Sequence, residues 1–466
     1  MLFQRTNRSS SGSLSQNALF SSAGFDSANS SSSNRRHSTA HLHGINQQQE
    51  THSMAGAFWE DLRRFLAPSA FTGMFPIDAR SGIGRRQPFF SRKSAPFWIS
   101  LVGLVLQFAL IGKLGYDLYN SVQIANDLSY SQTSLFALKL NRSLELITGP
   151  VLFALIVFLA KPIVCSLSNM NSSVLQIPKR RKPSRPMRQK VANLSCVGHV
   201  CFYALMTVVS AMIEFVTQVG RESRDEETNL EWVFRFVGFG CTLWYKAAMV
   251  WWPVFIKKIA EACTESCRDL FESTIHFMRN SELKIAIAGI TEHADSAAGL
   301  ENCTRKWATF RTASHEFLDS VSPIVTFMIF YDAVQFCTVA YMFLANAIGQ
   351  TEFQRFILIV VGFTGVAFVS IWSSYTLCHS VEKITEADGK AIRKLDELST
   401  KNLTISGKIE VQRIIAEGFF FAREHRAMGL FGTKKKMLVA MSNAFITYLI
   451  VFLQFNHDDL STRPTH

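Results

Sequence analysis

The sequence predicts an all-α polytopic membrane protein with seven transmembrane helices, a cytoplasmic N-terminus and long cytoplasmic helical extensions. Three observations predict this class. Apolar runs of ~20 residues, the length that crosses a bilayer, recur along a chain that is 48% hydrophobic and only 18% charged. Basic residues gather in the loops beside some of these runs. Two long stretches between runs keep their apolar residues on one helix face without being apolar overall.

The N-terminal part differs in composition from the rest. Residues 1–56 are rich in Ser, Asn, Gln, His and Gly, so they bury too little apolar surface to fold and are expected to form a disordered cytoplasmic tail. Residues 57–95 are expected to form an amphipathic pre-membrane segment, because Phe58, Trp59 and Leu62 recur at near-helical spacing among charged residues. This segment either lies on the inner membrane surface or packs against the helices.

Seven hydrophobic spans follow. They are expected at about residues 96–118, 144–166, 197–219, 232–256, 323–348, 356–378 and 437–456. The first four helices therefore occupy residues 96–256, and helices five and six occupy residues 323–378. Residues 257–322 form a predicted cytoplasmic helical segment, 379–436 a cytoplasmic anchor segment, and 457–466 an extracellular tail. The apolar stripes of the two cytoplasmic segments need partners, either within one subunit or between subunits.

Charges in the loops predict the orientation. Residues 84–93 and 168–195 contain Arg and Lys but no acidic residue, whereas residues 220–231 contain five acidic residues and only two Arg. Because Arg and Lys are retained in the cytoplasm, the N-terminus is predicted inside and the C-terminus outside. A G-protein-coupled receptor, the main alternative class, has the opposite orientation and carries sequence signatures in its third and seventh helices that are not found here. A secondary transporter is the weaker alternative, since no internal repeat is found.

A short motif lies in the last span. Thr447 and Tyr448 are followed by five apolar residues and then by Gln454 and Phe455. Before the span, Gly418 is followed by Phe419 and Phe420, and Arg423 lies five residues after the glycine. This arrangement resembles the signature of the arthropod gustatory receptor family, seven-helix chemosensory receptor channels related to insect odorant receptors. The resemblance covers about residues 57–457.

The resemblance implies a tastant-gated, non-selective cation channel in the plasma membrane of chemosensory cells. It also implies a homotetramer, or a heterotetramer with related receptors, in which the seventh helices line a central pore. Phe455 would be the hydrophobic barrier at the constriction and Gln454 its polar neighbour. Thr447 and Tyr448 would lie deeper, and Val451 shares a helix face with Thr447 and Gln454 at ~3.6 residues per turn.

The sequence leaves the ligand open between a sugar and a bitter compound. Leu449 stands where the sugar-receptor branch commonly has Glu, whereas the stretch 66–76 resembles sugar receptors. Polar and aromatic side chains in the predicted outer halves of spans two to five form the candidate ligand pocket, because such groups within a membrane usually face a cavity. They are Glu145, Thr148, Glu214, Arg235, Phe239, Thr242, Asp332, Gln335, Phe336 and Tyr341. A purely structural Glu214–Arg235 ion pair is the alternative for those two residues.

Other chemistry finds little support in the sequence. The nine cysteines fall in spans or predicted inner loops, so no disulfide framework is expected. Cys263 and Cys267 are four residues apart, which favours packing on one helix face over metal binding. No phosphate-binding loop, nucleophile elbow or metal cluster is found, so neither an enzyme nor a cofactor is expected. The net charge of +12 is attributed to the cytoplasmic membrane face rather than to nucleic acid, with membrane lipid, permeating cations and a small-molecule tastant as the expected partners.

Overall fold

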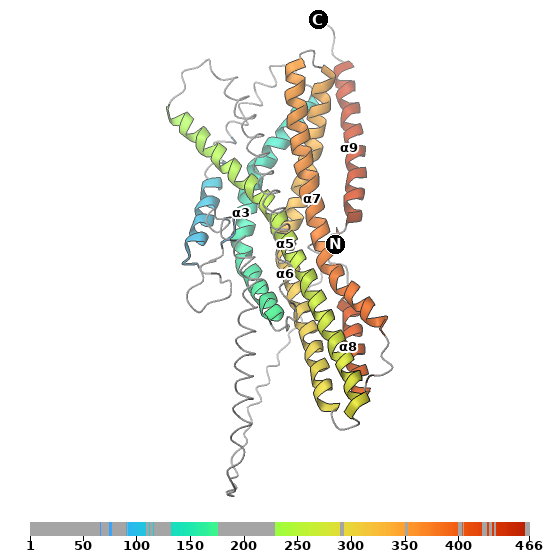
Figure 1. The fold of residues 1–466 in the computed structure, drawn as a ribbon. Coiled ribbons are helices and arrows are strands. Elements are labelled where there is room, and N and C mark those ends of the chain that lie inside the picture. The colour runs from blue at the N-terminus through green and yellow to red at the C-terminus, as the bar shows by residue number, and fades with distance from the viewer. Residues whose placement is uncertain are drawn as a thin grey trace, which may run out of the picture. The chain divides into compact units, whose positions relative to one another are not determined.

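The computed structural model describes a set of long helices and one small ribbon (Figure 1). The described residues are 66, 74–76, 90, 92–108, 111, 115, 132–175, 229–288, 293–349, 353–398, 403, 405–421, 426–427, 431–432 and 435–461. Their main helices are α3 (Gln132–Leu175), α5 (Asn229–Ala288), α6 (His293–Gly349), α7 (Phe353–Asp396), α8 (Ile405–Phe421) and α9 (Lys435–Ser461). A shorter apolar helix covers Ala95–Phe108. The predicted all-α class is therefore confirmed.

Strands β1 (Arg426–Ala427) and β2 (Phe431–Gly432) pair antiparallel between α8 and α9. Arg426 lies opposite Gly432, and Ala427 opposite Phe431. This ribbon was not predicted within the anchor segment 379–436. The segment instead contains the end of α7, the whole of α8, the ribbon and the first residues of α9.

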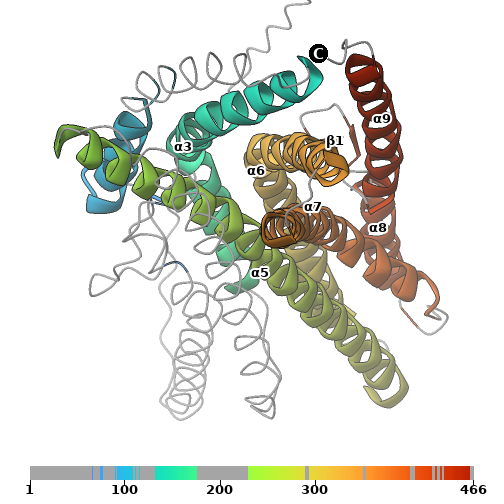
Figure 2. The same ribbon diagram turned by 90° about the horizontal axis from the view of Figure 1, so that it is seen from above.

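Helices α5, α6 and α7 each combine a predicted span with a predicted cytoplasmic segment in one uninterrupted element. In α5, the helix passes Ile256 and continues to Ala288, because the apolar stripe of the span is extended by further apolar residues at helical spacing. Ile259, Cys263, Cys267 and Leu270 of this stripe are buried. Figure 2 shows α7 between α5 and α6, which agrees with the extensive contacts that α7 makes with both.

Most apolar residues on the helix faces of the predicted segments 257–322 and 379–436 therefore pack against other helices of the same chain. In the second stripe Ile384, Ala391 and Leu395 are buried, whereas Leu398 and Ile409 are exposed, so packing of these last two against another subunit stays a prediction. The Cys263 thiol lies 3.6 Å from the sulfur of Met170 on α3. Burial raises the pKa of Cys263 to about 12, and this thiol is part of the packed core.

Aromatic side chains dominate the middle of the core. Trp251 stacks on Phe255 with ring centroids 4.9 Å apart, and Trp252 meets Phe255 edge-on at 5.5 Å. Phe75, from the predicted pre-membrane segment, is fully buried against Trp252 at 5.3 Å. Of the two alternatives for that segment, packing against the helices holds at Phe75, and Leu66 is fully buried as well.

A glycine permits a close helix contact in the predicted membrane region. A Cβ atom on Gly103 would lie only 2.5 Å from Cη2 of Trp244, so the bare backbone of the Ala95–Phe108 helix makes room for the indole of α5. Nearby, the Gln107 side chain donates a 2.9 Å hydrogen bond to the carbonyl of Cys241. The first and fourth predicted spans therefore contact each other through the close packing of Trp244 on Gly103 and through a buried hydrogen bond.

Two stretches of the described residues are long and apolar enough to cross a membrane, Ile147–Met170 and Gly299–Tyr341. The first overlaps the predicted span 144–166, and the second contains part of the span 323–348. The span 197–219 lies outside the described residues. Seven crossings and their orientation therefore stay predictions.

Candidate functional site

Helix α9 presents the residues of the C-terminal motif on its exposed side. Thr447, Val451 and Gln454 are all exposed, and at ~100° per residue they fall within a narrow arc of the helix. Tyr448, beside this arc, is 62% exposed. Phe455 lies within α9, but its side chain is outside the described part of the structure. The predicted grouping of Thr447, Val451 and Gln454 on one face agrees with the helix.

The opposite side of α9 attaches the helix to the rest of the chain. Met437, Leu438 and Met441 pack against the core cluster. Further along, the Phe445 ring meets Phe336 of α6 with centroids 6.1 Å apart. Phe445 lies about 160° around the helix from Thr447, at ~100° per residue. One face of α9 is therefore held by α6 while the motif face points away from this contact.

Asp332, Gln335 and Phe336 of α6 lie within an arc of ~100° of the helix next to this contact, whereas Tyr341 lies about 180° around the helix from Asp332. Asp332, Gln335 and Tyr341 are buried, and Phe336 is half-buried. The Ser374 hydroxyl of α7 donates a 3.1 Å hydrogen bond to Oδ2 of Asp332. A hydroxyl donor partly compensates a carboxylate for the loss of water. The Phe336–Phe445 contact links this group to α9.

The remaining pocket candidates are distributed differently. Thr148 is buried on α3, and its hydroxyl donates to the carbonyl of Leu144 in the same helix at 2.6 Å. That bond uses the hydroxyl proton within α3. The side chains of Glu145, Arg235, Phe239 and Thr242 lie outside the described residues, although their helices α3 and α5 are described, and Glu214 lies outside them altogether. Among the described side chains, the structure therefore places only Asp332, Gln335 and Phe336 near one another, as neighbours on one side of α6.

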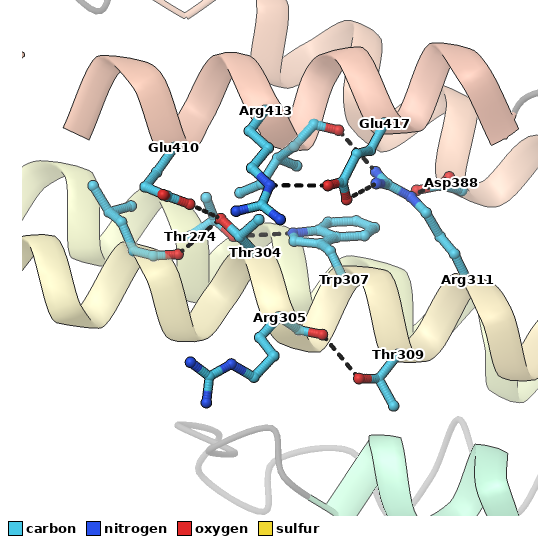
Figure 3. A network of polar contacts seen from close by, with 12 residues as sticks. Thr274, Thr304, Arg305, Trp307, Thr309, Arg311, Asp388, Glu410, Arg413 and Glu417 are labelled. Carbon is cyan, nitrogen blue, oxygen red and sulfur yellow. Dashed lines mark hydrogen bonds and ion pairs between the residues drawn. The ribbon is translucent and has the colours of Figure 1, made fainter. Parts of the chain in front are cut away.

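A second polar cluster, which the sequence reasoning missed, joins α6 to α7 and α8 (Figure 3). Arg311 of α6 has only 1% of its side chain exposed. Its Nε lies 2.8 Å from Oδ2 of Asp388, and its Nη2 donates to the carbonyl of Ile414 at 3.1 Å. Glu417 approaches the same guanidinium at 3.9 Å, and the ring of Trp307 lies 5.2 Å below it. We call these residues the Arg311 cluster.

Further contacts extend the Arg311 cluster along the helices. The Trp307 indole N–H donates to the Thr274 hydroxyl of α5 at 3.2 Å, and Thr304 bonds Glu410 of α8 at 2.7 Å. Burial raises the pKa of the Asp388 carboxyl, and the adjacent guanidinium of Arg311 opposes that rise. Four helices are thus joined by contacts that involve charge or a hydrogen bond.

Gly418 allows α8 to approach this closely. A Cβ atom there would lie 2.5 Å from Cγ1 of Ile392 and 2.8 Å from Nη2 of Arg311. Close packing therefore explains why glycine is the first residue of the Gly418-Phe419-Phe420 sequence. A signal for the cluster existed in the sequence, because Arg311 occupies the same helical register as the buried Trp307, Ser314 and Leu318.

The fold described above is shared with known receptor structures. No family model matches the sequence, and no curated protein matches it. Among solved structures, the insect olfactory receptor OR5 from Machilis hrabei superposes with a TM-score of 0.59 at 13% identity, covering 85% of this chain and 97% of the receptor. The chain has the olfactory-receptor fold. The same receptor in complex with eugenol gives a TM-score of 0.57 at 14% identity, covering 85% of this chain and 98% of that one.

The olfactory-receptor fold agrees with the resemblance found in the sequence, which pointed to chemosensory channels related to insect odorant receptors. The neighbours are receptors rather than enzymes. Agreement extends over nearly the whole length of the neighbour.

Proposed function

We propose that the chain is a subunit of a chemosensory, ligand-gated cation channel of the gustatory type, resident in the plasma membrane. The main support for this proposal is that α9 has two distinct faces. One face carries the exposed Thr447, Val451 and Gln454, and the other is attached to α6 through Phe445 and Phe336. A pore helix needs such a division, because it must be held by its own subunit and still face a shared axis.

In this proposal four subunits surround a central pore lined by α9. Gln454 and Phe455 form the constriction, where a ring of Phe side chains excludes water and hence ions. The proposed ligand pocket includes Asp332, Gln335 and Phe336, which share one side of α6. Occupation of this pocket would alter the Phe336–Phe445 contact and so shift α9, which gives ligand binding a direct physical route to the pore.

A sugar or bitter tastant is the first candidate ligand class, from the motif. A small aromatic odorant is the second candidate, and it is favoured by the similarity to a receptor whose structure was solved in complex with eugenol. Both classes use a pocket with an aromatic wall and few polar groups, which suits Phe336 on the same side of α6 as Asp332.

Current recording from cells that express this chain alone tests the proposal. Sugars, bitter compounds and eugenol would be applied in turn to the same cells. Ligand-evoked cation current that persists when G-protein signalling is blocked supports a channel. Responses that disappear under that block, together with an N-terminal tag labelled on intact cells, would instead establish a G-protein-coupled receptor.

A further inference from the structure

The positive charges of three lysines act on His379 of α7, the helix that contacts both α5 and α9. Lys257 follows directly on the predicted span 232–256, Lys383 lies one turn beyond His379 on α7, and Lys435 is the first residue of α9. Desolvation lowers the pKa of His379, and the positive charges of Lys435, Lys383 and Lys257 lower it further. We call these four residues the basic junction. They belong to three different helices, so the fold alone brings them together.

The basic junction has too few anionic partners for its positive charge. Glu382 is the one acidic group that opposes the lysines at His379, and its Oε2 lies 3.8 Å from Nζ of Lys435. Within the described part of the chain, the ammonium groups of Lys257 and Lys383 form no ion pair. Glu386, the next acid along α7, is held by Lys390 at 2.6 Å and also interacts with the charge of Lys435, so two carboxylates face three lysines of the junction together with Lys390.

His379 adds an unmet polar atom to this charge. Its Nδ1 is buried and has no hydrogen-bond partner among the described residues. Ammonium groups and an imidazole N–H are all donors, so together they suit an anion with several acceptor oxygens. A phosphate group has this character.

An exposed apolar surface leads along α7 to the basic junction. Ile371 is 57% exposed and Tyr375 is 45% exposed, and both lie on the helix face that carries His379. The Tyr375 ring stacks on the His379 ring, with centroids 5.8 Å apart and planes inclined by 23°. From Ile371 to Lys383 the helix rises ~18 Å, close to the thickness of one hydrocarbon leaflet.

We propose that this face binds an anionic phospholipid, with its phosphate at Lys257, Lys383 and Lys435 and an acyl chain along Ile371 and Tyr375. The proposal rests on the membrane insertion contained in the proposed function. A free phosphate would use only the charged end and would leave the apolar surface unexplained. The order of apolar, aromatic and basic side chains is the order met on passing from the membrane interior to its surface.

The test measures binding of dioctanoyl phosphatidylinositol 4-phosphate to the purified, detergent-solubilised full chain. We expect the double variant Lys257→Gln, Lys383→Gln to weaken binding by about 20-fold, since each lysine near an anionic headgroup contributes about fivefold. Lys257→Arg with Lys383→Arg should retain the affinity. Lys390→Gln is the matched control on α7 and should change affinity by less than about twofold, because Lys390 is held by Glu386.

Two further measurements separate the lipid from other occupants. Ile371→Ser should weaken binding of the lipid but not of free inositol 1,4-bisphosphate, and the free headgroup should bind more weakly than the lipid. Equal affinity of the headgroup and the lipid, or unchanged affinity in the lysine double variant, overturns the proposal. A change in assembly size on Ile371→Ser with unaltered lipid affinity would assign the face to a second copy of the chain and also overturn it.

Failure of this site is distinguishable from failure of the proposed function. Extraction of membranes with alkaline carbonate reports whether the chain is integral to the bilayer. A chain that stays in the membrane and binds no anionic lipid refutes the lipid site alone. A chain released by carbonate refutes membrane insertion, and with it both proposals.

Discussion

Helices α6 and α9 lie beside each other but meet their surroundings in different ways. Around Arg311, α6 buries one face completely, and its polar groups there bond to α5, α7 and α8. Helix α9 buries only a narrow strip, and large apolar side chains such as Val439, Ile446 and Ile450 are exposed. The first region is complete within one chain. In the proposed channel, the exposed apolar side chains of α9 would contact lipid or further subunits.

This difference predicts which substitutions change the stability of the folded chain and which change conduction. Around Arg311, a substitution changes the stability of the folded chain, because a buried charge loses a partner or a packed contact is forced apart. On the exposed face of α9, a substitution leaves the folded chain intact and acts on whatever lies opposite that face. Stability and conduction should therefore respond to different sets of residues.

The largest expected effect is on the Arg311 cluster. Asp388→Ala leaves the guanidinium of Arg311 buried with a weaker partner, and we expect it to cost about 3 kcal/mol of stability. Asp388→Asn keeps a hydrogen-bond acceptor and should cost clearly less. Thermal unfolding in detergent, followed by size-exclusion chromatography, measures both. Equal unfolding temperatures for wild type and Asp388→Ala would show that this cluster does not hold the helices together.

The next largest loss of stability, about 2 kcal/mol, is expected for Gly418→Ala, because the added methyl group collides with Ile392 and Arg311. Gly389→Ala is the matched control. It also lies in a helix, a Cβ atom there meets nothing within 4 Å, and we expect a gain of up to about 1 kcal/mol. The same thermal assay compares them. A destabilised Gly389→Ala or a neutral Gly418→Ala would contradict the packing described for α8.

On α9 the expected effect is on current. Phe455→Ala should raise the unstimulated current by about tenfold, which corresponds to lowering a barrier by ~1.4 kcal/mol, because methyl groups no longer exclude water from the constriction. Leu453→Ala is the control, since Leu453 lies about 160° around the helix from Phe455 at ~100° per residue. Patch-clamp recording at matched surface expression measures both. Indistinguishable basal currents in the two variants would remove Phe455 from the pore.

The smallest expected effect on stability is that of Gln454→Ala. The side chain is exposed, so unfolding should change by less than about 0.5 kcal/mol. Gating or ion preference should nevertheless change, which reversal potentials in mixed cation solutions would reveal. A large loss of stability without altered permeation would mean that the exposed face of α9 serves folding rather than conduction.

The helical class could be predicted from hydropathy, and the division of α9 from its motif. Residues that are neighbours on one helix, such as Thr447, Val451 and Gln454, follow directly from a period of 3.6 residues. Burial of Asp332 and Gln335 could also be expected, because polar groups in an apolar run seldom face lipid. In each case the information lies within a few turns of one helix.

The Arg311 cluster could not be predicted in the same way. Arg311 and Asp388 are 77 residues apart, and Arg311 and Ile414 are 103 residues apart, so no local pattern pairs them. The basic junction is similar, since Lys257, His379 and Lys435 come from three helices. The β1–β2 ribbon was missed for another reason. Gly429 and Gly432 were available as turn signals, but the segment was assigned as helical from the apolar stripes before it.

The Arg311 cluster also limits how this chain can be recombined with others. Replacing the chain from Ile405 onward by that of another receptor would carry α8 and α9 away from α6. Such an exchange would separate Arg311 from Ile414, Glu417 and the space beside Gly418, and the incoming helix would meet a buried cation without a matching acceptor. A chimaera junction placed after Phe421 keeps Arg311 and its acceptors on α7 and α8 in the same parent receptor. Helix α9 could then be exchanged between receptors, whereas α8 could not.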